Sequence, residues 1–479
     1  MIGREKERQT LERLYQRQKA EFVAIYGRRR VGKTFLVDET FGDRITFRHA
    51  GLSPAEWRNK EEALSAQLNH FYKSLKLHGL QDAECPTDWL EAFYLLEKLL
   101  LNMPGSERQV IFLDELPWMD TEDSLFISAL EGFWNTWACH RKNLMLVVCG
   151  SASSWMLDRL INNHGGLYGR LTCSIRLAPF TLRESEQFLQ EKGVKLSRYD
   201  IVQAYMAVGG IPYYLDAFEE GLSLAQNLDQ MFFADYAKFE DEYDRLFSSI
   251  FTDPDRMKTI ISILYSRNAG FTRKQIGEKL GMSSGGTLTN LLTALIGSDF
   301  VTRYYPYGLS RREVYYKLTD PFCLFYLHFL SGSGRKDHYF WLNSQNTPSV
   351  VSWRGYAFEN VCFRHIDQIK QALGIGGVRS EHSAWSVRED DREGAQIDLL
   401  IKRDDHVLNA CEIKFVGDEF AVDQGYYRKL QSRQQLLMET ISPKWSIHQT
   451  LITTYGLRYN EYSGIFSRVI VIKDLFREL

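Results

Sequence analysis

Three short apolar runs stand out in the first third of the chain. Residues 22–26, 110–113 and 144–149 are aliphatic, aromatic or sulfur-containing, and charged or small residues follow each run. Runs of this length are typical of strands that are buried on both faces of a parallel sheet. A more mixed run at 173–177 predicts a further strand. The pattern therefore predicts an α/β domain over residues 1–180.

The middle of the chain changes to helical periodicity. Apolar residues recur at spacings of three and four from about 181 to 247, and this spacing predicts helices. Further on, Thr272 and Ser283 are N-cap candidates and Gly281 is a helix stop. Three helices followed by a hairpin make a winged helix. We therefore expect a helical lid at 181–250 and a winged helix at 251–332, with helices at 256–265, 272–281 and 283–296 and strands at 300–305 and 313–318.

The last third of the chain reads as a separate α/β domain. An apolar stretch at 321–330 predicts a core helix, and the Gly- and Ser-rich residues 331–337 are the best linker candidate. Beyond them, 394–401 and 407–415 are apolar runs joined by a polar turn, which predicts two adjacent strands. We place a domain boundary at the linker, so that residues 333–479 form the C-terminal domain.

Composition narrows the class of protein. The chain has 479 residues, 44% of them hydrophobic and 25% charged, and its formal net charge is -3. These values are ordinary for a globular protein, and they give no overall basic field that would attract nucleic acid. The seven cysteines are scattered, which favours reduced thiols. Neither a signal peptide nor a membrane-spanning run is visible, so we expect a cytoplasmic multidomain protein.

Residues 27–34 carry the strongest motif. They read GRRRVGKT and fit the phosphate-binding P-loop, in which backbone N–H groups surround the phosphates. Lys33 is expected to reach the β- and γ-phosphates, and the Thr34 hydroxyl to bind Mg²⁺. The alternative is a glycine-containing turn beside a basic cluster. We expect ATP contacts from Gly27, Arg28, Arg29, Arg30, Val31, Gly32, Lys33, Thr34 and Phe35.

Polar residues at the ends of the following strands complete a nucleotide site. Asp114 is expected to hold the Mg²⁺ ion, and Glu115 to polarise the attacking water. Ser151 is either a γ-phosphate sensor or the N-cap of the next helix. Arg170, in a glycine-rich segment, is either an arginine finger or a surface arginine. If Arg170 acts on a neighbouring subunit, the active ATPase is a homo-oligomer.

Five motifs in order suggest a family. They are IGREKE at 2–7, GRRRVGKT at 27–34, LDE at 113–115, CGS at 149–151 and VGGIP at 208–212. Together they resemble the archaeal ATPases of the AAA+/STAND group of P-loop NTPases, over about the first 330 residues. The resemblance implies that Gly3 and Arg4 contact the nucleotide near the adenine. It also implies that Pro212 approaches the nucleotide from the lid.

A second constellation lies in the C-terminal domain. Asp398 and Glu412 stand on the two adjacent strands, and Lys414 lies two positions after Glu412, on the same face. Two carboxylates would hold Mg²⁺, and the lysine would position or activate water for attack on a phosphodiester. Glu359, on an upstream helix, completes the metal set. The alternative is a solvated strand face.

The same residues resemble the PD-(D/E)xK nuclease fold. That fold has a helix with Glu, then Asp, then Glu-x-Lys on adjacent strands, and the resemblance covers about residues 352–441. It implies that Gln424, Tyr427 and Lys429 open a helix with supporting polar residues. The resemblance also matches the C-terminal domain that accompanies ATPases of this family.

The winged helix allows two roles. Its third helix offers Ser284, Thr287, Thr289 and Asn290 but no basic side chain, whereas the wing carries Arg303, Arg311 and Arg312. Phosphate contacts usually supply most of the affinity for DNA, so the wing is the better DNA-binding candidate. Winged helices in STAND proteins also act as packing modules, and both roles stay open here.

Two functional hypotheses follow. In the first, an ATPase couples its nucleotide state to a Mg²⁺-dependent nuclease-like domain that acts on nucleic acid, DNA in the first place. In the second, the chain is an ATP-dependent switch or sensor of the STAND type, and its nuclease fold binds without cleaving. A transporter-type ATPase is disfavoured, since no membrane segment is visible.

Overall fold

The structure, a computed structural model, describes residues 1–53, 59–103, 108–162, 165–282, 285–307, 314–332, 337–389 and 392–479. The predicted winged-helix residues Ser283, Ser284, Arg311 and Arg312, and part of the predicted linker, lie outside these ranges. Contacts between Cα atoms divide the chain into two units. Unit 1 comprises Met1–Pro179, Asp244–Lys258 and Asn290–Asp299, and unit 2 comprises Phe180–Tyr243, Thr259–Thr289 and Phe300–Leu479.

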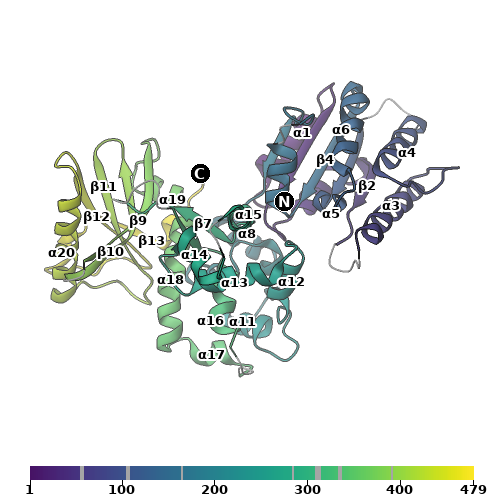
Figure 1. Cartoon of the computed structure of the whole chain (residues 1–479). Coiled ribbons are helices and arrows are strands. Elements are labelled where there is room, and N and C mark those ends of the chain that lie inside the picture. The colour runs from purple at the N-terminus through teal and green to yellow at the C-terminus, as the bar shows by residue number, and fades with distance from the viewer. Residues whose placement is uncertain are drawn as a thin grey trace. The chain divides into compact units, whose positions relative to one another are not determined.

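Unit 1 is built on a parallel sheet of five strands in the order β2-β3-β4-β1-β5 (Figure 1). Every neighbouring pair in it runs parallel. The three central strands, β3, β4 and β1, are almost wholly buried, because apolar side chains cover both of their faces, whereas the two edge strands are partly exposed. All four strands that we predicted in this unit are confirmed. The strands are β1 (Glu21–Tyr26), β2 (Ile45–Ala50), β3 (Gln109–Asp114), β4 (Leu144–Gly150) and β5 (Cys173–Arg176).

Helices of unit 1 pack against this sheet. Side chains of α3, α4 and α6, such as Phe71, Leu96 and Leu130, share one core cluster with Phe22 and Leu146 of the sheet. Burying a large apolar side chain contributes roughly 1.5–3 kcal/mol, so this cluster fixes one face of the sheet. The helices are α1 (Glu5–Tyr15), α2 (Lys33–Phe41), α3 (Lys60–Leu77), α4 (Trp89–Asn102), α5 (Leu116–Met119), α6 (Phe126–Thr136) and α7 (Ser153–Trp155), with short 3₁₀ turns at Gly42–Arg44 and Ala138–His140 and a π-helical turn at Met156–Ile161.

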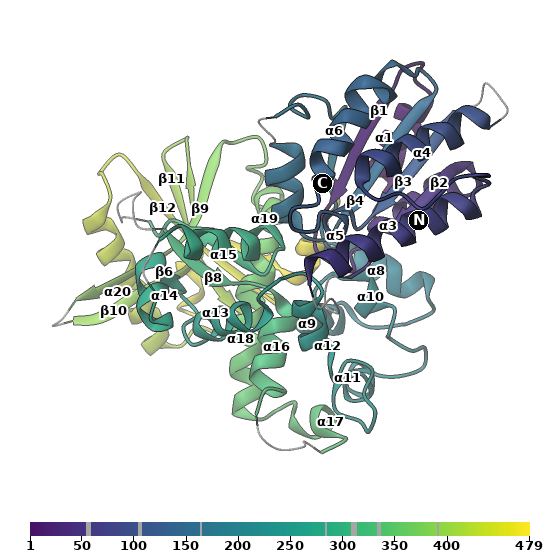
Figure 2. The same cartoon turned by 45° about the vertical axis from the view of Figure 1, so that its right-hand side comes forward.

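Unit 2 opens with helices gathered around an aromatic cluster. Rings of Phe325, Phe329, Trp341 and Trp353 contact one another with centroids 5.1–5.6 Å apart. The cluster joins helices on both sides of the predicted linker, and Figures 1 and 2 both show α16 beside α18. The helices are α8 (Leu182–Glu191), α9 (Arg198–Val208), α10 (Pro212–Leu215), α11 (Leu224–Phe232), α16 (Pro321–Phe329), α17 (Phe340–Ser344), α18 (Pro348–Arg364) and α19 (Ile366–Ala372).

The winged-helix pattern is present within residues 254–318. Thr272 caps α14 in a capping box with Gln275, and Gly281 ends that helix in the left-handed conformation (φ 64°), as the sequence predicts. The strands form an antiparallel sheet in the order β6-β8-β7. The elements are α12 (Glu242–Ser248), α13 (Pro254–Tyr265), β6 (Phe271–Thr272), α14 (Arg273–Leu280), α15 (Gly286–Gly297), β7 (Val301–Tyr304) and β8 (Tyr315–Leu318).

The C-terminal part of unit 2 is a second five-stranded sheet, in the order β13-β12-β11-β10-β9. The pairs β9–β10 and β10–β11 run antiparallel, and β11–β12 and β12–β13 run parallel. Figure 1 shows α20 on one side of this sheet and α18 on the other. The elements are β9 (Ser380–Glu389), β10 (Arg392–Arg403), β11 (Val407–Lys414), α20 (Gln424–Thr440), β12 (Ser446–Thr453) and β13 (Arg468–Val471), with 3₁₀ turns at Ser463–Ile465 and Ile472–Phe476.

Across the described ranges, every helix is too short or too polar to cross a bilayer.

Candidate functional site

The P-loop connects β1 to α2 at the carboxyl end of the sheet. Gly27 has φ 148°, and a Cβ atom at this position would lie 2.3 Å from the carbonyl oxygen of Leu177. Only glycine fits there. Gly32 also has a positive φ, 89°, and directly precedes α2. The two glycines therefore give the loop the curl that a phosphate needs.

Lys33 lies under this loop. Its Nζ donates to the carbonyl oxygens of Gly27 at 3.0 Å and Arg28 at 3.2 Å. Burial lowers the pKa of Lys33, whereas the nearby Glu115, Cys149 and Asp114 act in the opposite direction. An ammonium group with two weak carbonyl acceptors can move to phosphate oxygens, which are better partners for a charge.

Thr34 and Asp114, the two residues that we expect to bind Mg²⁺, lie side by side. The Thr34 hydroxyl donates to Asp114 Oδ2 at 2.7 Å, although the two residues are 80 positions apart. Burial raises the pKa of Asp114, and the hydrogen bond from Thr34 opposes this shift. A hydroxyl and a carboxylate side by side, next to a phosphate loop, are the oxygen donors that suit Mg²⁺. The donor set therefore fits the ion.

Glu115 and Ser151 are directly coupled. Both the backbone N–H and the hydroxyl of Ser151 donate to Glu115 Oε2, at 3.0 and 2.7 Å. Glu115 itself has φ 46°, and its carboxylate points from the end of β3 to the end of β4. The N-cap of α7 is Ala152, so Ser151 does not cap that helix with its side chain. Its hydroxyl instead holds the carboxylate that we expect to act on water.

Arg4 supports the P-loop from the N-terminal segment. Its Nη2 donates to the carbonyl oxygens of Val31 at 3.1 Å and Ala178 at 2.8 Å, and only 5% of the residue is exposed. Gly3 precedes it with φ 60°. The contact to Val31 shows that Arg4 bears on the loop itself, and its contact with adenine stays a prediction.

The other predicted nucleotide residues differ in exposure. Arg28 is buried, whereas Phe35 is 55% exposed at the start of α2. The Arg29 guanidinium lies 5.4 Å from the ring of Trp118. Arg170 is exposed, in a turn in which its N–H donates to Leu167. Pro212 begins α10, which belongs to unit 2. The finger role of Arg170 and the lid role of Pro212 therefore stay predictions.

The structure brings Asp398, Glu412 and Lys414 together. Leu399 of β10 pairs with Cys411 of β11 in antiparallel register, so Asp398 and Glu412 are the next neighbours along the two strands. The backbone N–H of Ile413 donates to Asp398 Oδ2 at 3.2 Å. Lys414 Nζ lies 2.7 Å from Glu412 Oε1. The strand register therefore makes one polar centre of the three side chains.

Glu412 is held by three partners. Besides Lys414, it accepts a hydrogen bond from Arg433 Nη1 at 2.7 Å and another from the Tyr426 hydroxyl. Although burial alone would raise the pKa of Glu412, the charges of Lys414 and Arg433 lower it. The pKa of Lys414 is correspondingly raised despite its own burial. Glu412 is therefore a stable anion, and Lys414 a stable cation, at neutral pH.

Glu359, on α18, lies close to this centre but has its own partners. Its Oε2 accepts a hydrogen bond from Asn268 Nδ2 at 3.0 Å. Burial raises the pKa of Glu359, and Lys317 of β8 opposes that shift. The pKa of Asp398 is raised to about 7 by burial and then by the carboxylates of Glu412 and Glu359. The carboxylates of Glu359 and Glu412 are therefore close enough to Asp398 to raise its pKa.

Within the described residues, no three His, Cys, Asp or Glu side chains are grouped closely enough to hold one metal ion. Glu359, Asp398 and Glu412 are therefore not grouped as one metal site in the structure. Their joint role as metal ligands stays a prediction. Asp398 and Glu412 still supply the adjacent carboxylate oxygens that Mg²⁺ prefers. The chemistry of the donors fits the ion, and their present partners would have to give way to it.

Sequence reasoning missed several residues of this centre. It expected Gln424, Tyr427 and Lys429 as supporting residues, but Tyr426 and Arg433 take that part. Tyr427 instead packs near Tyr462, with ring centroids 5.4 Å apart. Residues seven positions apart on a helix share one face, so the spacing of Tyr426 and Arg433 was the available signal. No local pattern pointed to Lys317 or Asn268.

Comparison with known proteins classifies the N-terminal half of the molecule. Residues 1–218 match the model of a family described as an ATPase domain predominantly from Archaea. These residues are a P-loop ATPase domain. The matched range of the ATPase domain contains the P-loop, Asp114, Glu115 and Ser151.

A curated relative extends beyond the ATPase domain. The uncharacterized protein MJECL04 of Methanocaldococcus jannaschii is 26% identical over 445 residues, which cover 91% of this chain and 92% of the relative. Among solved structures, the Walker-type ATPase PABY2304 of Pyrococcus abyssi has 18% identity and a TM-score of 0.44, over 68% of this chain and 95% of that chain. The ORC2 protein of Aeropyrum pernix, solved as ADPNP–ADP complexes, has 13% identity and a TM-score of 0.39, over 76% and 95%.

Proposed function

We propose that this ATPase couples ATP binding and hydrolysis to a Mg²⁺-dependent nuclease-like centre at Asp398, Glu412 and Lys414. The buried carboxylate Glu412, held by Lys414 and Arg433 beside Asp398, carries the second half of the proposal. A buried carboxyl group with a raised pKa, as at Asp398, beside a fixed ammonium group is a candidate for a functional site. The substrate would be nucleic acid, DNA in the first place.

At the ATP site each residue has a distinct task. Lys33 would leave its carbonyl acceptors for the phosphates, and Thr34 with Asp114 would hold Mg²⁺. Glu115 would orient the attacking water once the Ser151 contacts open. Arg170 would stabilise developing charge on the phosphoryl group, in its own subunit or in a neighbouring one of a homo-oligomer.

At the second centre, Asp398 and Glu412 would bind Mg²⁺, which supplies charge neutralisation and a polarised water when present. Lys414 keeps its proton at neutral pH, because Glu412 raises its pKa. It is therefore suited to orient a water molecule or to stabilise the charge on a cleaved phosphate, and not to accept a proton. The Arg433 and Tyr426 contacts would fix the orientation of Glu412.

The test is a cleavage assay of the full chain with Mg²⁺ on single- and double-stranded DNA and RNA. Asp398→Asn should lower cleavage by on the order of 10²-fold or more, as loss of a metal ligand does. The matched control is Asp404→Asn, since Asp404 is an exposed carboxylate in the turn that joins the same strands. Equal rates for the two variants, or no cleavage of any substrate, would contradict the nuclease proposal.

A second function, an ATP-dependent switch, is favoured by one observation. Glu115 accepts two hydrogen bonds from Ser151, an arrangement that keeps the hydrolytic carboxylate engaged and suits slow turnover. In that case the chain would bind ATP tightly and hydrolyse it slowly, and the C-terminal domain would bind without cleaving. Single-turnover hydrolysis measured beside ATP binding distinguishes the two functions.

A further inference from the structure

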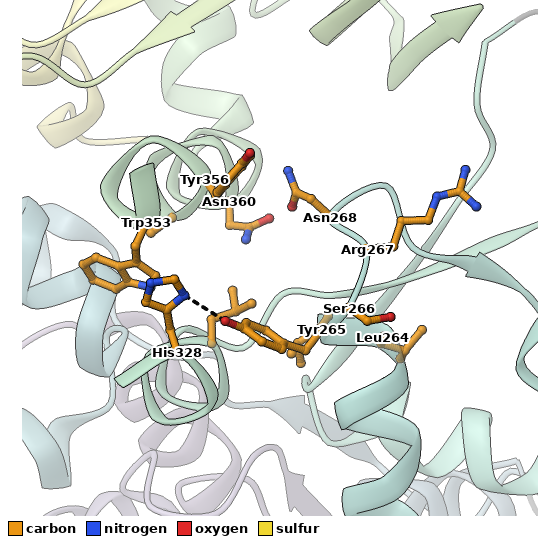
Figure 3. Close-up of a pocket in the computed structure, with 12 residues that line it drawn as sticks. Leu264, Tyr265, Ser266, Arg267, Asn268, His328, Trp353, Tyr356 and Asn360 are labelled. Atoms are coloured by element: carbon orange, nitrogen blue, oxygen red, sulfur yellow. Dashed lines mark hydrogen bonds between the residues drawn. The ribbon is translucent and has the colours of Figure 1, made fainter. Parts of the chain in front are cut away.

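A pocket of about 370 Å³ lies within unit 2, among the end of α13, the following loop, α16 and α18. Figure 3 shows Asn268 and Asn360 on one side of the space, with Trp353, His328 and Tyr265 on the other. The volume is in the range of small-ligand sites. Neither the P-loop site nor the Asp398 centre includes this pocket.

The pocket has aromatic walls held in place by hydrogen bonds. The Tyr265 hydroxyl is bonded to His328 Nδ1 at 2.8 Å, and His328 Nε2 to Ser349 Oγ at 3.1 Å. Trp353 packs edge-to-face against Phe325 and Trp341 and is 4% exposed. Two polar aromatic side chains and an indole therefore form a pre-ordered lining. Such linings bind flat rings by stacking.

Two buried polar atoms at this pocket have no partner. Asn360 Oδ1, on a residue only 3% exposed, and Trp353 Nε1 lack hydrogen bonds within the described residues. Leaving a buried donor or acceptor unsatisfied is unfavourable, and native proteins rarely leave one without a reason. Asn360 and Trp353 both line the pocket, so polar groups next to this space are not fully used by the contacts of the described residues.

We propose that this pocket binds a nucleobase. A base is a flat heterocycle with donors and acceptors around its edge, so it can stack on aromatic side chains while its edge bonds to amides. Asn268 and Asn360 present amide groups to the space, and Tyr356, 53% exposed, stands at its rim as a stacking platform (Figure 3). Arg267, also in the lining, supplies a cation for a phosphate or sugar-phosphate group.

The base can come from two sources, a free nucleotide or an unstacked base of a nucleic-acid strand. Asn268 joins the pocket to the Asp398 centre, because it lines the pocket and donates to Glu359. A strand with one base in the pocket would therefore pass next to Glu359. The idea that the base belongs to a nucleic-acid strand rests on the proposed nuclease function. Binding of a base as such does not depend on that function.

The experiment measures binding of 2-aminopurine riboside and of a single-stranded oligodeoxynucleotide that contains one 2-aminopurine, by fluorescence, in the full chain. Both probes are used in a Lys33→Ala background, and the riboside carries no phosphate, so that the P-loop does not contribute. Asn360→Leu should weaken binding of the probe at least tenfold, the scale of one lost hydrogen-bonding group. Asn343→Leu, at an exposed amide on α17, should not change it.

A second variant guards against a folding defect in Asn360→Leu. Tyr356→Ala alters a rim residue that the core does not need, and it should weaken binding about tenfold by loss of stacking. If both variants weaken binding of the riboside, the pocket binds the base of a free nucleotide. If they weaken binding of the oligonucleotide alone, the pocket binds a base that belongs to a nucleic-acid strand. No binding, or equal binding by Asn360→Leu, Tyr356→Ala and the control, would overturn the inference.

The two proposals fail separately. Base binding that persists in Asp398→Asn while no substrate is cleaved leaves the pocket in place and removes the nuclease. Cleavage that depends on Asp398 but is unaffected by Asn360→Leu and Tyr356→Ala, with no base binding, removes the pocket alone.

Discussion

Asp398 and Glu412 are adjacent carboxyl groups whose surroundings shift their pKa values in opposite directions. Glu412 has Lys414, Arg433 and Tyr426 around it, so its pKa falls despite burial. Asp398 is buried and has two carboxylate neighbours, so its pKa rises to about 7 although the backbone N–H of Ile413 opposes the shift. At neutral pH, Glu412 thus stays ionised, whereas Asp398 is only partly ionised. Such a division is common where two carboxylates share one task.

The raised pKa of Asp398 predicts a pH-dependent stability. Between pH 4 and 7 the folded chain holds a proton that the unfolded chain has lost, so the free energy of unfolding falls as the pH rises. Asp398→Asn removes this loss of stability, because asparagine does not ionise. Without metal, at pH 8, we expect the variant to be more stable by roughly 1–3 kcal/mol, and the gain should disappear near pH 4. Hydrogen exchange of the β10 and β11 amides in EDTA measures it.

The control for this measurement is Asp404→Asn, which changes an exposed carboxyl group on the same hairpin. It should leave the stability within about 0.5 kcal/mol of the parent at every pH. A gain for Asp398→Asn that is the same at pH 4 and pH 8 would show that its pKa is not raised in the folded chain.

Glu115 carries a prediction about the ATP site. Glu115→Gln keeps the acceptor for Ser151 but removes the charge that orients water, so ATP should still bind while hydrolysis falls by roughly 10²–10⁴-fold. ATP binding by calorimetry and phosphate release under single-turnover conditions separate the two effects. Glu122→Gln is the control, since Glu122 is an exposed carboxylate that pairs with Lys60. Unchanged hydrolysis by Glu115→Gln would assign the water-orienting role elsewhere.

At the scale of elements, the winged helix contacts the C-terminal sheet and α18. Asn268, in the loop before β6, donates to Glu359 of α18. Arg364 of α18 donates to the carbonyl oxygen of Thr319, just after β8, at 3.1 Å. Tyr307, after β7, donates its N–H to Ala384 of β9 at 3.2 Å and packs against the core of that sheet. These contacts favour a packing role for the winged helix.

Removing one of these contacts should loosen the elements locally. Asn268→Ala leaves the buried Glu359 carboxylate without its amide donor, and we expect a loss of roughly 1–3 kcal/mol. Faster hydrogen exchange in β6, β8 and α18, with exchange in the unit 1 sheet unchanged, measures the effect. Asn343→Ala is the control, because that amide is exposed. If α18 exchanges as in the parent, the Asn268–Glu359 contact does not hold the winged helix to the C-terminal domain.

At the level of the whole molecule, the P-loop site and the Asp398 centre lie in different units. Lys33 and Asp114 belong to unit 1, and Asp398 and Glu412 to unit 2. Coupling between them requires that ATP and ADP favour different states of the chain. We expect ATP to change the cleavage rate by about 5- to 150-fold relative to ADP or no nucleotide, the usual range of allosteric coupling.

Lys33→Ala should remove this ATP dependence and leave the basal, nucleotide-free cleavage intact. The measurement is the cleavage rate with ATP, ADP or neither, for the parent and the variant. Lys60→Ala is a suitable control, since Lys60 is an exposed lysine of unit 1 that pairs with surface carboxylates. Equal cleavage under all three conditions would mean that the two centres act independently.

Agreement between sequence and structure is best where the chemistry is local. The P-loop, the ends of β3 and β4, and the Glu-x-Lys pair of β11 lie on continuous segments, and hydrophobic periodicity placed those segments correctly. The antiparallel turn between β10 and β11 is short, so it also predicted that Asp398 meets Glu412. The winged helix was visible because Thr272 and Gly281 mark both ends of α14.

The residues that were missed act across long separations. Asn268 reaches Glu359 over 91 positions, and Lys317 influences the same carboxylate from β8. The orphan Asn360 oxygen and the pocket it lines depend on how α13, α16 and α18 pack. None of these contacts corresponds to a periodic pattern or a motif in the sequence.

The amino-acid order alone establishes which chemical groups are available and on which strands and helices they stand, because backbone periodicity and turn residues act over a few positions. The opposite pKa shifts of Asp398 and Glu412, the hydrogen bonds from Ser151 to Glu115 and the pocket beside Asn360 depend instead on the folded chain. Burial and pairing set these properties, and both arise from groups that meet only after the chain has folded.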